Sequence, residues 1–260
     1  MSASPPPAPG TRPAGVAAEG AAAHVRAMFD RIAPTYDRAN HLLSLSVDRY
    51  WRWRTVRALR LRLPPHPRVP LRILDVCCGT GDLSLALAAG LAPGATIVGA
   101  DFSLAMLQRA RAKSGPRLEW IQADALRLPY PDASFAAVTS AFGFRNLADY
   151  RAGLAEFFRL LAPGGTLAIL EISRPSLPVL AQLYPFYFQR LLPRLGGWIS
   201  GHPAAYRYLP DSVSRFPNPP QLAQWMREAG FSPVRFTRFA GGLASLHLAT
   251  RPAAVSAHLG

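Results

Sequence analysis

Hydrophobic residues fall into short continuous runs, separated by longer segments in which apolar positions recur at helical spacing. The runs predict buried strands at residues 71–76, 96–101, 118–124, 135–142 and 166–172. Helices are predicted after the first, second and fourth runs, in "DLSLALAAGL", "SLAMLQRARAKSG" and "DYRAGLAEFFRLLAPGG". Strands that alternate with helices predict the α/β class, with a Rossmann-like, doubly wound and mostly parallel sheet.

The two ends of the chain depart from this alternation. "AAAHVRAMFDRIA" predicts a helix that ends before Pro34, and residues 1–20, rich in Pro, Ala and Gly, predict a disordered leader. Near the C-terminus, "VRFTRFAGGLASLHLAT" predicts an antiparallel hairpin around Gly241-Gly242. We therefore expect one domain over residues 21–252, with an N-terminal helical cap over about 21–63.

Residues 174–220 interrupt the alternation after the fifth strand. The segment is rich in proline and aromatic residues and has no strand pattern. An α/β enzyme can carry a substrate cap at this point of the chain. An insertion without a role in binding fits the pattern equally well, so both interpretations stay open.

The charge balance points to partners that carry phosphate. The chain has 29 Lys and Arg against 15 Asp and Glu, which gives a formal net charge of +14. Such an excess favours nucleic acid or anionic lipid headgroups as partners. The alternative is an organism whose proteins are generally rich in arginine.

Cysteine and histidine usage argues against a disulfide framework and against a metal site. Cys77 and Cys78 are the only cysteines, and the six histidines are scattered along the chain, so we predict a reducing compartment and no metal. The first twenty residues lack the apolar core of a signal peptide. The longest uncharged run, 83–100, is broken by Pro93-Gly94 and does not fit a membrane span. We expect a soluble, cytoplasmic protein.

The stretch "RILDVCCGTGDLSL" joins the first strand to its helix through Gly79-Thr80-Gly81, shortly after Asp75. A strand, a glycine turn and a helix bring backbone N–H groups close to a ligand. The third glycine of a dinucleotide fingerprint would fall on Ser84, so a pyrophosphate cofactor is disfavoured. Cys77 and Cys78 occupy positions that require compact side chains, and we interpret them as spacers rather than as nucleophiles or ligands.

Acidic residues end three successive strands and suggest the cofactor. Asp101 ends the second strand, where a carboxylate can accept both hydroxyls of a ribose, and Asp124-Ala125 at the third strand can frame an adenine. Together with Asp75, these groups suit a ligand with an adenine, a ribose, a positive charge and no phosphate. S-adenosylmethionine (SAM) is such a molecule. The alternative is that all three carboxylates only cap helices.

Two classes of methyl acceptor compete, and the residues disfavour nucleic acid. Enzymes that methylate base amino groups carry an Asn/Asp-Pro-Pro-aromatic motif after the fourth strand. Here "GFRN" follows that strand, while "NPP" stands far away at 218–220, before Gln221. A base C5-methyltransferase needs a catalytic cysteine further along the sheet, and both cysteines lie in the cofactor turn. A small or lipidic acceptor is therefore expected, and no nucleic-acid partner.

Four blocks of sequence resemble the ubiquinone/menaquinone biosynthesis C-methyltransferase family, and the resemblance runs from about residue 24 to 250. The blocks are "FDRIAPTYDRANHLLSLSVDRYWRW" (29–53), "DVCCGTGDLS" (75–84), "FGFRNLADYRAGLAEFFRLLAPGGTLAILEIS" (142–173) and "AAYRYLPDSVSRFPNPPQLAQWMREAGF" (204–231). The resemblance implies the class I SAM-dependent methyltransferase fold and methylation of a ring carbon of a polyprenylated quinol. Carried across by position, the implied SAM contacts are Thr80, Asp101, Asp124, Ala125 and Ser140.

The resemblance leaves several points open. The double cysteine favours demethylmenaquinol as the acceptor and menaquinol as the product, with a ubiquinone precursor, or both, as the alternative. Ser46-Val47-Asp48 stands where the family usually has Gly, a branched apolar residue and His, so a role for that histidine does not transfer. A homodimer is one candidate assembly. A further alternative is a SAM-binding protein without catalytic activity, although suitable residues occupy the expected cofactor positions.

Methylation of a ring carbon is easier once a phenolic hydroxyl of the quinol is ionised. A phenol with a pKa of about 10 costs roughly 4 kcal/mol to ionise at neutral pH, and a nearby cation can supply most of this. Arg145 in "FGFRN" is the candidate cation and is expected to face the sulfonium of the methyl donor. Tyr36, Asp37 and Asn40 of the first block are expected to close over the ring and relay its proton.

"RYWRWRTVRALRLR" (49–62) has the composition of a segment that contacts a membrane surface. It contains six Arg and two Trp and no acidic residue, which favours anionic lipid headgroups. On a helical wheel Arg52 falls among Val56, Leu59 and Leu63, so the charges do not separate cleanly. Transient contact with the inner face of the cytoplasmic membrane and an ordinary solvated helix are both consistent with this pattern.

Overall fold

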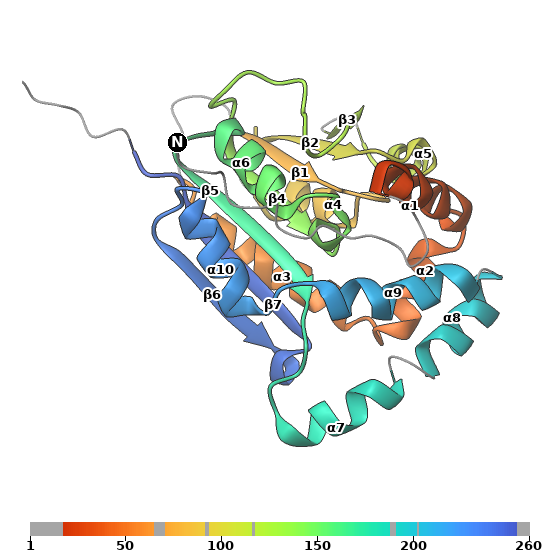
Figure 1. Cartoon of the computed structure of the whole chain (residues 1–260). Coiled ribbons are helices and arrows are strands. Elements are labelled where there is room, and N and C mark those ends of the chain that lie inside the picture. The colour runs from red at the N-terminus through yellow and green to blue at the C-terminus, as the bar shows by residue number, and fades with distance from the viewer. Residues whose placement is uncertain are drawn as a thin grey trace, which may run out of the picture.

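A computed structural model describes residues 18–64, 71–91, 94–115, 118–187, 191–201 and 203–253. Most of the expected leader, residues 1–17, lies outside this part of the chain. The described residues form one seven-stranded sheet that is flanked by helices (Figure 1). Its strands are β1 (Arg72–Val76), β2 (Thr96–Asp101), β3 (Leu118–Gln122), β4 (Phe135–Ala141), β5 (Leu161–Ile172), β6 (Val234–Phe239) and β7 (Ala244–Thr250).

The strand order is β3-β2-β1-β4-β5-β7-β6, and β7 is antiparallel to both of its neighbours while the others pair in parallel. This confirms the doubly wound α/β sheet with a C-terminal antiparallel hairpin. From β1 the chain first moves to β2 and β3 on one side and then crosses to β4 on the other. The carboxyl ends of β1 and β4 therefore flank the switch point, where sheets of this kind bind ligands.

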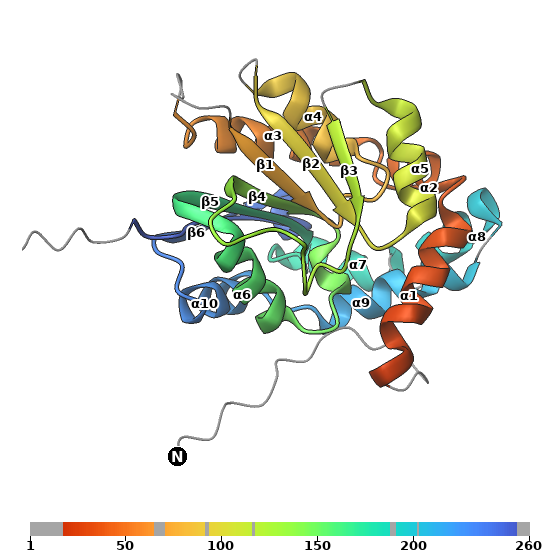
Figure 2. The ribbon, with the colours of Figure 1, turned by 90° about the horizontal axis from the view of Figure 1, so that it is seen from above.

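Helices cover both faces of the sheet. α3 (Val47–Arg60), α4 (Asp82–Gly90) and α5 (Leu104–Lys113) lie on one face, and α6 (Tyr150–Leu160) and α10 (Pro219–Glu228) on the other (Figure 2). Strand residues alternate between the two cores: Ile73 packs with Val56 of α3, whereas its neighbour Leu74 packs with the core that contains Tyr150 of α6. This alternation is the expected consequence of the period-two geometry of a strand.

Side-chain caps fix the starts of two of these helices. The Ser103 hydroxyl accepts a hydrogen bond from the Met106 N–H, and the Asp149 carboxylate accepts from the N–H groups of Arg151 and Ala152. Such caps satisfy donors that the first helical turn leaves free. Because Ser103 caps it, α5 begins directly after the end of β2, and the short connection between the two stays against the sheet.

Two strand boundaries differ from the sequence expectation by more than one residue. The third strand ends at Gln122 rather than 124, because Asp124 enters a turn in which its carbonyl accepts from Arg127. The fifth strand begins at Leu161, five positions early, because the Pro-Gly-Gly stretch stays within an extended segment. A register irregularity between Phe135 and Ala137 and a positive φ at Gly164 accommodate it.

The N-terminus contributes the further helices α1 (Ala18–Ile32) and α2 (Tyr36–Leu43), and residues 174–220 contribute α7 (Pro178–Phe186), α8 (Leu192–Ser200) and α9 (Pro203–Arg215). Of these helices, α1, α2, α8 and α9 group together beyond the carboxyl ends of the parallel strands, and α7 lies apart from them (Figure 1). Ile32, Ala39 and Tyr206 share one buried cluster, which packs the N-terminal helices against α9. In the described part of the chain no helix is long and apolar enough to cross a membrane.

Candidate active site

A cavity of about 550 Å³ lies at the carboxyl ends of β1 to β4. Its wall includes these predicted site residues: Tyr36, Asp75, Gly79, Thr80, Asp101, Asp124 and Ala125. The other predicted site residues do not line it: Asp37, Asn40, Gly81, Ser140 and Arg145. α1 closes one side of the cavity through Ala22, Ala23, Arg26 and Phe29. The sheet and the N-terminal cap therefore share the cavity.

Asp101 is fixed by the backbone around it. Its two carboxylate oxygens accept hydrogen bonds from the N–H groups of Gly79 (2.8 Å) and Ser103 (2.9 Å). Burial nevertheless raises the pKa of this carboxyl to about 6, against the effect of those donors. The Phe102 backbone contributes a further hydrogen bond, and a carboxylate can accept about four. Asp101 therefore keeps room for a hydroxyl group of a ligand.

Asp75 ties the first strand to its neighbours. Its side chain is fully buried and accepts from Ser84 (2.6 Å) on α4 and from Thr139 (2.9 Å) on β4. Burial raises its pKa to about 6 as well, although both hydroxyls oppose the shift. Both donors come from the protein, so this carboxylate fixes the start of α4 against the sheet.

The glycine turn has the tight geometry that its sequence predicts. Gly79 and Gly81 have positive φ angles of 55° and 84°, and Gly81 is the N-cap of α4. A Cβ on Gly81 would lie 2.5 Å from the indole of Trp120. Only glycine therefore satisfies both the backbone angle and the packing here.

The two cysteines form no disulfide. A Cβ on Gly143, in the "FGFRN" loop, would lie 2.3 Å from the Cβ of Cys77, so the two loops meet at this point. Burial raises the pKa of both thiols well above the ordinary range. A thiolate is the reactive form of cysteine, so this environment opposes nucleophilic or ligand chemistry.

The remaining predicted cofactor contacts differ in exposure. Asp124 is exposed at the cavity, and one of its oxygens accepts from the Leu126 N–H (2.9 Å), which leaves the other for a ligand. Ala125 is buried beside it. Ser140 is fully buried on β4 and its Oγ has no hydrogen-bond partner among the described residues. Ser140 does not line the cavity, whereas its neighbours Ala141 and Phe142 do, so its contact with a cofactor stays a prediction.

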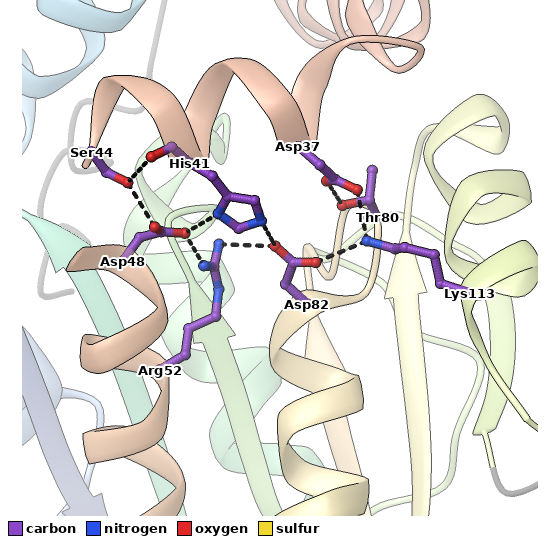
Figure 3. Close-up of polar contacts among 8 residues, drawn as sticks. All are labelled: Asp37, His41, Ser44, Asp48, Arg52, Thr80, Asp82 and Lys113. Atoms are coloured by element: carbon purple, nitrogen blue, oxygen red, sulfur yellow. Dashed lines mark hydrogen bonds and ion pairs between the residues drawn. The ribbon is translucent and has the colours of Figure 1, made fainter. Parts of the chain in front are cut away.

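A chain of charged side chains joins the N-terminal cap to the glycine turn (Figure 3). The Thr80 hydroxyl donates to Asp37, whose carboxylate also pairs with Lys113 (2.8 Å). Lys113 pairs in turn with Asp82 (2.8 Å) at the start of α4. Asp37 therefore holds α2 against the glycine turn and α5, and its part in relaying a proton stays a prediction.

The chain continues through Arg52 to α3 (Figure 3). Arg52 NH1 donates to Asp48, its NH2 lies 3.7 Å from Asp82, and His41 lies between the same two carboxylates. Burial would raise the pKa of Asp48, but the Ser44 hydroxyl and the Arg52 charge keep it below its ordinary value. Although His41, Asp48 and Asp82 bring ligand-type atoms within 4.8 Å of one another, cationic side chains already balance both carboxylates.

Arg145 lies in a buried ion pair. Its NH1 is 3.1 Å from Glu171 Oε2 and also donates to the Phe142 carbonyl, and its backbone N–H donates to Glu171 Oε1 (3.0 Å). Burial alone would lower the pKa of Arg145, but the Glu171 carboxylate raises it, so the side chain stays charged. The pair fixes the loop after β4, and any effect of Arg145 on a bound ring must act through a neighbour.

Tyr36 is such a neighbour. It lines the cavity, and its hydroxyl hydrogen-bonds to the Asn40 side chain. Burial raises the pKa of Tyr36, whereas the charges of Arg145 and Arg52 both oppose that rise. Asn40 thus positions Tyr36 from the next turn of α2, and Tyr36 is the predicted catalytic residue that reaches the cavity directly.

Sequence reasoning missed Arg52, Asp82 and Phe142 on the cavity wall. Arg52 was grouped with the surface arginines of residues 49–62. The helical wheel contained the correct signal, because it placed Arg52 on the same side as Val56 and Leu59, which are buried. A charged residue on the buried side of a helix needs a partner, and here the partners are carboxylates.

The polar groups on the cavity wall fit SAM. Asp101 and Asp124 offer acceptors for a ribose and an adenine amine, and Phe102 and Leu126 add apolar surface to the same wall. Carboxylates outnumber cations on the wall, which suits a ligand with a sulfonium. The cations on this wall are Arg26 and Arg52.

Comparisons of the sequence with a family model and with known relatives agree on one family. Residues 17–251 match the model of the ubiE/COQ5 methyltransferase family. A demethylmenaquinone methyltransferase of Thermus thermophilus is 50% identical over 228 residues, which cover 86% of this chain and 100% of that relative. A ubiquinone/menaquinone biosynthesis C-methyltransferase of Geobacter sp. is 42% identical over 233 residues, which cover 87% and 96% of the two chains.

Solved structures share the fold at low sequence identity. A SAM-dependent methyltransferase from Thermotoga maritima superposes with a TM-score of 0.61 at 19% identity, covering 88% of this chain and 100% of that one. The [4+2]-cyclase SpnF superposes with a TM-score of 0.64 at 16% identity, covering 95% and 98%. Because one neighbour is named a cyclase, the fold by itself does not specify the reaction.

Proposed function

Because the chain belongs to the ubiE/COQ5 methyltransferase family, we propose that it transfers the methyl group of SAM to a ring carbon of a polyprenylated quinol. Demethylmenaquinol is the acceptor and menaquinol the product. The observation that carries this proposal is the family match over nearly the whole described chain, combined with a cavity whose carboxylates fit SAM. Relatives named for both ubiquinone and menaquinone biosynthesis keep the ubiquinone precursor as the second candidate acceptor.

The residues of the cavity divide between cofactor and acceptor. Asp101 would accept the ribose hydroxyls, and Asp124 with Ala125 would hold the adenine. When bound, SAM supplies a methyl group on a sulfonium. The ring carbon of the quinol that receives this methyl group would have to lose a proton. The chain must therefore favour the ionised quinol and accept a proton.

We assign the first of these tasks to the charge of Arg145 acting beside Tyr36. Arg145 is permanently charged and lies close enough to Tyr36 to oppose the rise of its pKa. The same field favours an ionised phenol on a quinol placed against Tyr36. Asn40 positions the Tyr36 hydroxyl, and Asp37 holds α2 in place through Thr80 and Lys113.

Kinetics of an Arg145→Met variant test this assignment. Removing the cation should cost most of kcat at pH 7, and raising the pH to 9–10 should restore part of it because the quinol then ionises without help. Affinity for SAM should stay unchanged. A loss of kcat that is flat with pH would mean that the Arg145–Glu171 pair only fixes the loop.

We further propose that the enzyme works in the cytoplasm and contacts the inner face of the cytoplasmic membrane, where a polyprenyl tail resides. α3 and the turn before it support this contact, because they expose Leu45, Tyr50 and Trp53 next to several arginines. Arg54 lies over the Tyr50 ring and Arg57 over the Trp53 ring. Aromatic rings beside cations are typical of membrane interfaces. One chain supplies the described cavity, so the proposal applies to a monomer and to a homodimer.

A direct assay tests the proposed function. The purified chain is incubated with SAM and reduced demethylmenaquinone in detergent, and the methylated quinol and S-adenosylhomocysteine are measured by mass spectrometry. Both products should appear in equal amounts, and Asp101→Ala should weaken SAM binding by about 2–4 kcal/mol. Binding of SAM without methylation of either quinol class would favour the non-catalytic alternative. Absence of SAM binding would reject the assignment of the cavity.

A further inference from the structure

We infer that Arg52 binds the α-carboxylate of the methionine part of SAM, which makes α3 part of the cofactor site. None of the predicted cofactor contacts supplies a cation for this group: they are carboxylates, hydroxyls and backbone positions. The inference rests on the proposed use of SAM. It assigns to the cavity a subsite for an α-amino carboxylate.

The order of the strands gives the direction of the ligand along the cavity. Asp124 follows β3, Asp101 ends β2, and the glycine turn follows β1, which is itself paired with β4. An adenine at Asp124 and a ribose at Asp101 would direct the rest of the molecule toward the ends of β1 and β4. The methionine part would therefore lie between the glycine turn and Phe142.

Arg52 lies at that end of the cavity. Its guanidinium carbon is 5.2 Å from the ring centroid of Phe142, and its NH2 is 3.7 Å from Asp82 at the start of α4. The other cation on the wall, Arg26, belongs to α1, which contacts α5. On α1, Phe29 lies beside Phe102, which follows Asp101 at the end of β2, so we place Arg26 on the ribose side of the cavity.

The surroundings of Arg52 hold its charge in place and leave donors for a ligand. Its side chain is 12% exposed, and within the described residues its hydrogen bond uses NH1, which donates to Asp48. A guanidinium has five N–H donors, and two of them can bind a carboxylate side by side. Asp82 lines the same stretch of wall, so the subsite offers a positive and a negative group to a ligand end that carries both charges.

Ligands with and without the amino acid end test the inference. S-adenosylhomocysteine carries the α-amino carboxylate, whereas 5′-methylthioadenosine keeps the adenine, ribose and sulfur but lacks it. Calorimetry should show that Arg52→Met lowers the affinity for S-adenosylhomocysteine about 10- to 100-fold. The affinity for 5′-methylthioadenosine should change less than about twofold, because that ligand does not reach Arg52.

Three further variants serve as controls. Arg52→Lys should recover part of the lost affinity, since it keeps the charge but not the planar fork. Asp48→Asn combined with Arg52→Met removes both charges of the buried pair and should reproduce the selective loss. Arg26→Met removes a cavity cation at the other end and should not discriminate between the two ligands.

The possible results separate this inference from the proposed function. Equal loss of affinity for both ligands would show that Arg52 only shapes the cavity, and unchanged affinity for both would show that it makes no contact. Either result overturns the inference and leaves the proposed use of SAM standing. If the unmodified protein binds neither ligand, the proposed function itself fails.

Discussion

Asp75 and Asp101 are buried carboxyls on the cavity wall, and their raised pKa values make the stability of the protein depend on pH. Burial raises the pKa of Asp75 from its ordinary value of 3.8 to about 6. Between these pH values the folded state binds more protons than the unfolded state, so the contribution of Asp75 to the free energy of unfolding falls as the pH rises. The total change across that window is about 3 kcal/mol.

Asp75→Asn removes this titration and keeps the shape of the side chain. The free energy of unfolding of the variant, relative to the unmodified protein, should therefore rise by about 2 kcal/mol between pH 4 and pH 7. Urea unfolding in the absence of cofactor measures it, and Asp211→Asn, at an exposed aspartate, provides the matched control. A difference in the free energy of unfolding that stays constant with pH would contradict the raised pKa of Asp75.

Individual site residues were predictable where the backbone alone places them. Asp101 ends a strand and Gly79 follows one, so their places at the carboxyl edge follow from the hydrophobic pattern. Arg145 was not predictable in the same way, because its orientation depends on Glu171, which is 26 positions away and buried in another strand. The same limit applies to Asp37, whose partners Thr80 and Lys113 come from separate elements.

At the scale of elements, α3 performs two roles with opposite faces. Arg52 and the buried Trp51 face the protein, while Arg49, Tyr50 and Trp53 are exposed. On the helical wheel of residues 49–62 the charged and apolar residues did not separate, because arginines lie on both the buried and the exposed face of the helix. The exposed face carries no acid, since Asp48 is buried and paired with Arg52.

Reversal of charge on this face tests its contact with lipid. Arg49→Glu combined with Arg57→Glu should lower binding to vesicles of anionic lipid at low salt by at least about 30-fold, since each basic residue near such a surface contributes about 1 kcal/mol. Cosedimentation measures it. Arg151→Glu with Arg227→Glu makes the same change of net charge on α6 and α10, on the opposite face of the sheet from α3, and should bind normally. Equal losses of vesicle binding in the two variants would show that the net charge, and not contact through α3, determines binding.

Some elements resist prediction for physical reasons. Residues 174–220 form helices although Pro185 and Pro210 lie inside two of them. Proline normally ends a helix, because it lacks the N–H and clashes with the preceding turn. The sheet was easier to predict, since each buried parallel strand is a short apolar run whose length and flanking turns identify it.

At the scale of the whole molecule, the cavity connects parts of the chain that are distant in sequence. Ala22 of α1, Asp101 of β2 and Asn146 after β4 all contribute to its wall. The alternation of strands and helices predicts the order of the sheet, but not that α1 would return to its carboxyl edge. That return depends on tertiary contacts such as the hydrogen bond between Asp30 and Ser103 (2.6 Å), which no local pattern specifies.

A ligand that fills the cavity should therefore stabilise the whole fold. S-adenosylhomocysteine at 100 times its Kd adds about 2.7 kcal/mol to the free energy of unfolding, which corresponds to a rise in Tm of roughly 5–10 °C. Hydrogen exchange of α1 should slow as well as that of the glycine turn. Asp101→Ala at the same ligand concentration should show a much smaller rise. Unchanged exchange in α1 would mean that this helix does not close on the ligand.

Trp120 under the glycine turn has a consequence for how the sequence can change. Its indole would contact a Cβ on Gly99 at 2.4 Å, and Gly99, unlike Gly81, has no positive φ that demands glycine. Whether a larger residue is tolerated at position 99 therefore depends on Trp120, which lies on the neighbouring strand β3. Gly99→Ala should be harmful alone and tolerated beside Trp120→Val, an intragenic suppression that a pairwise mutational scan would reveal as epistasis.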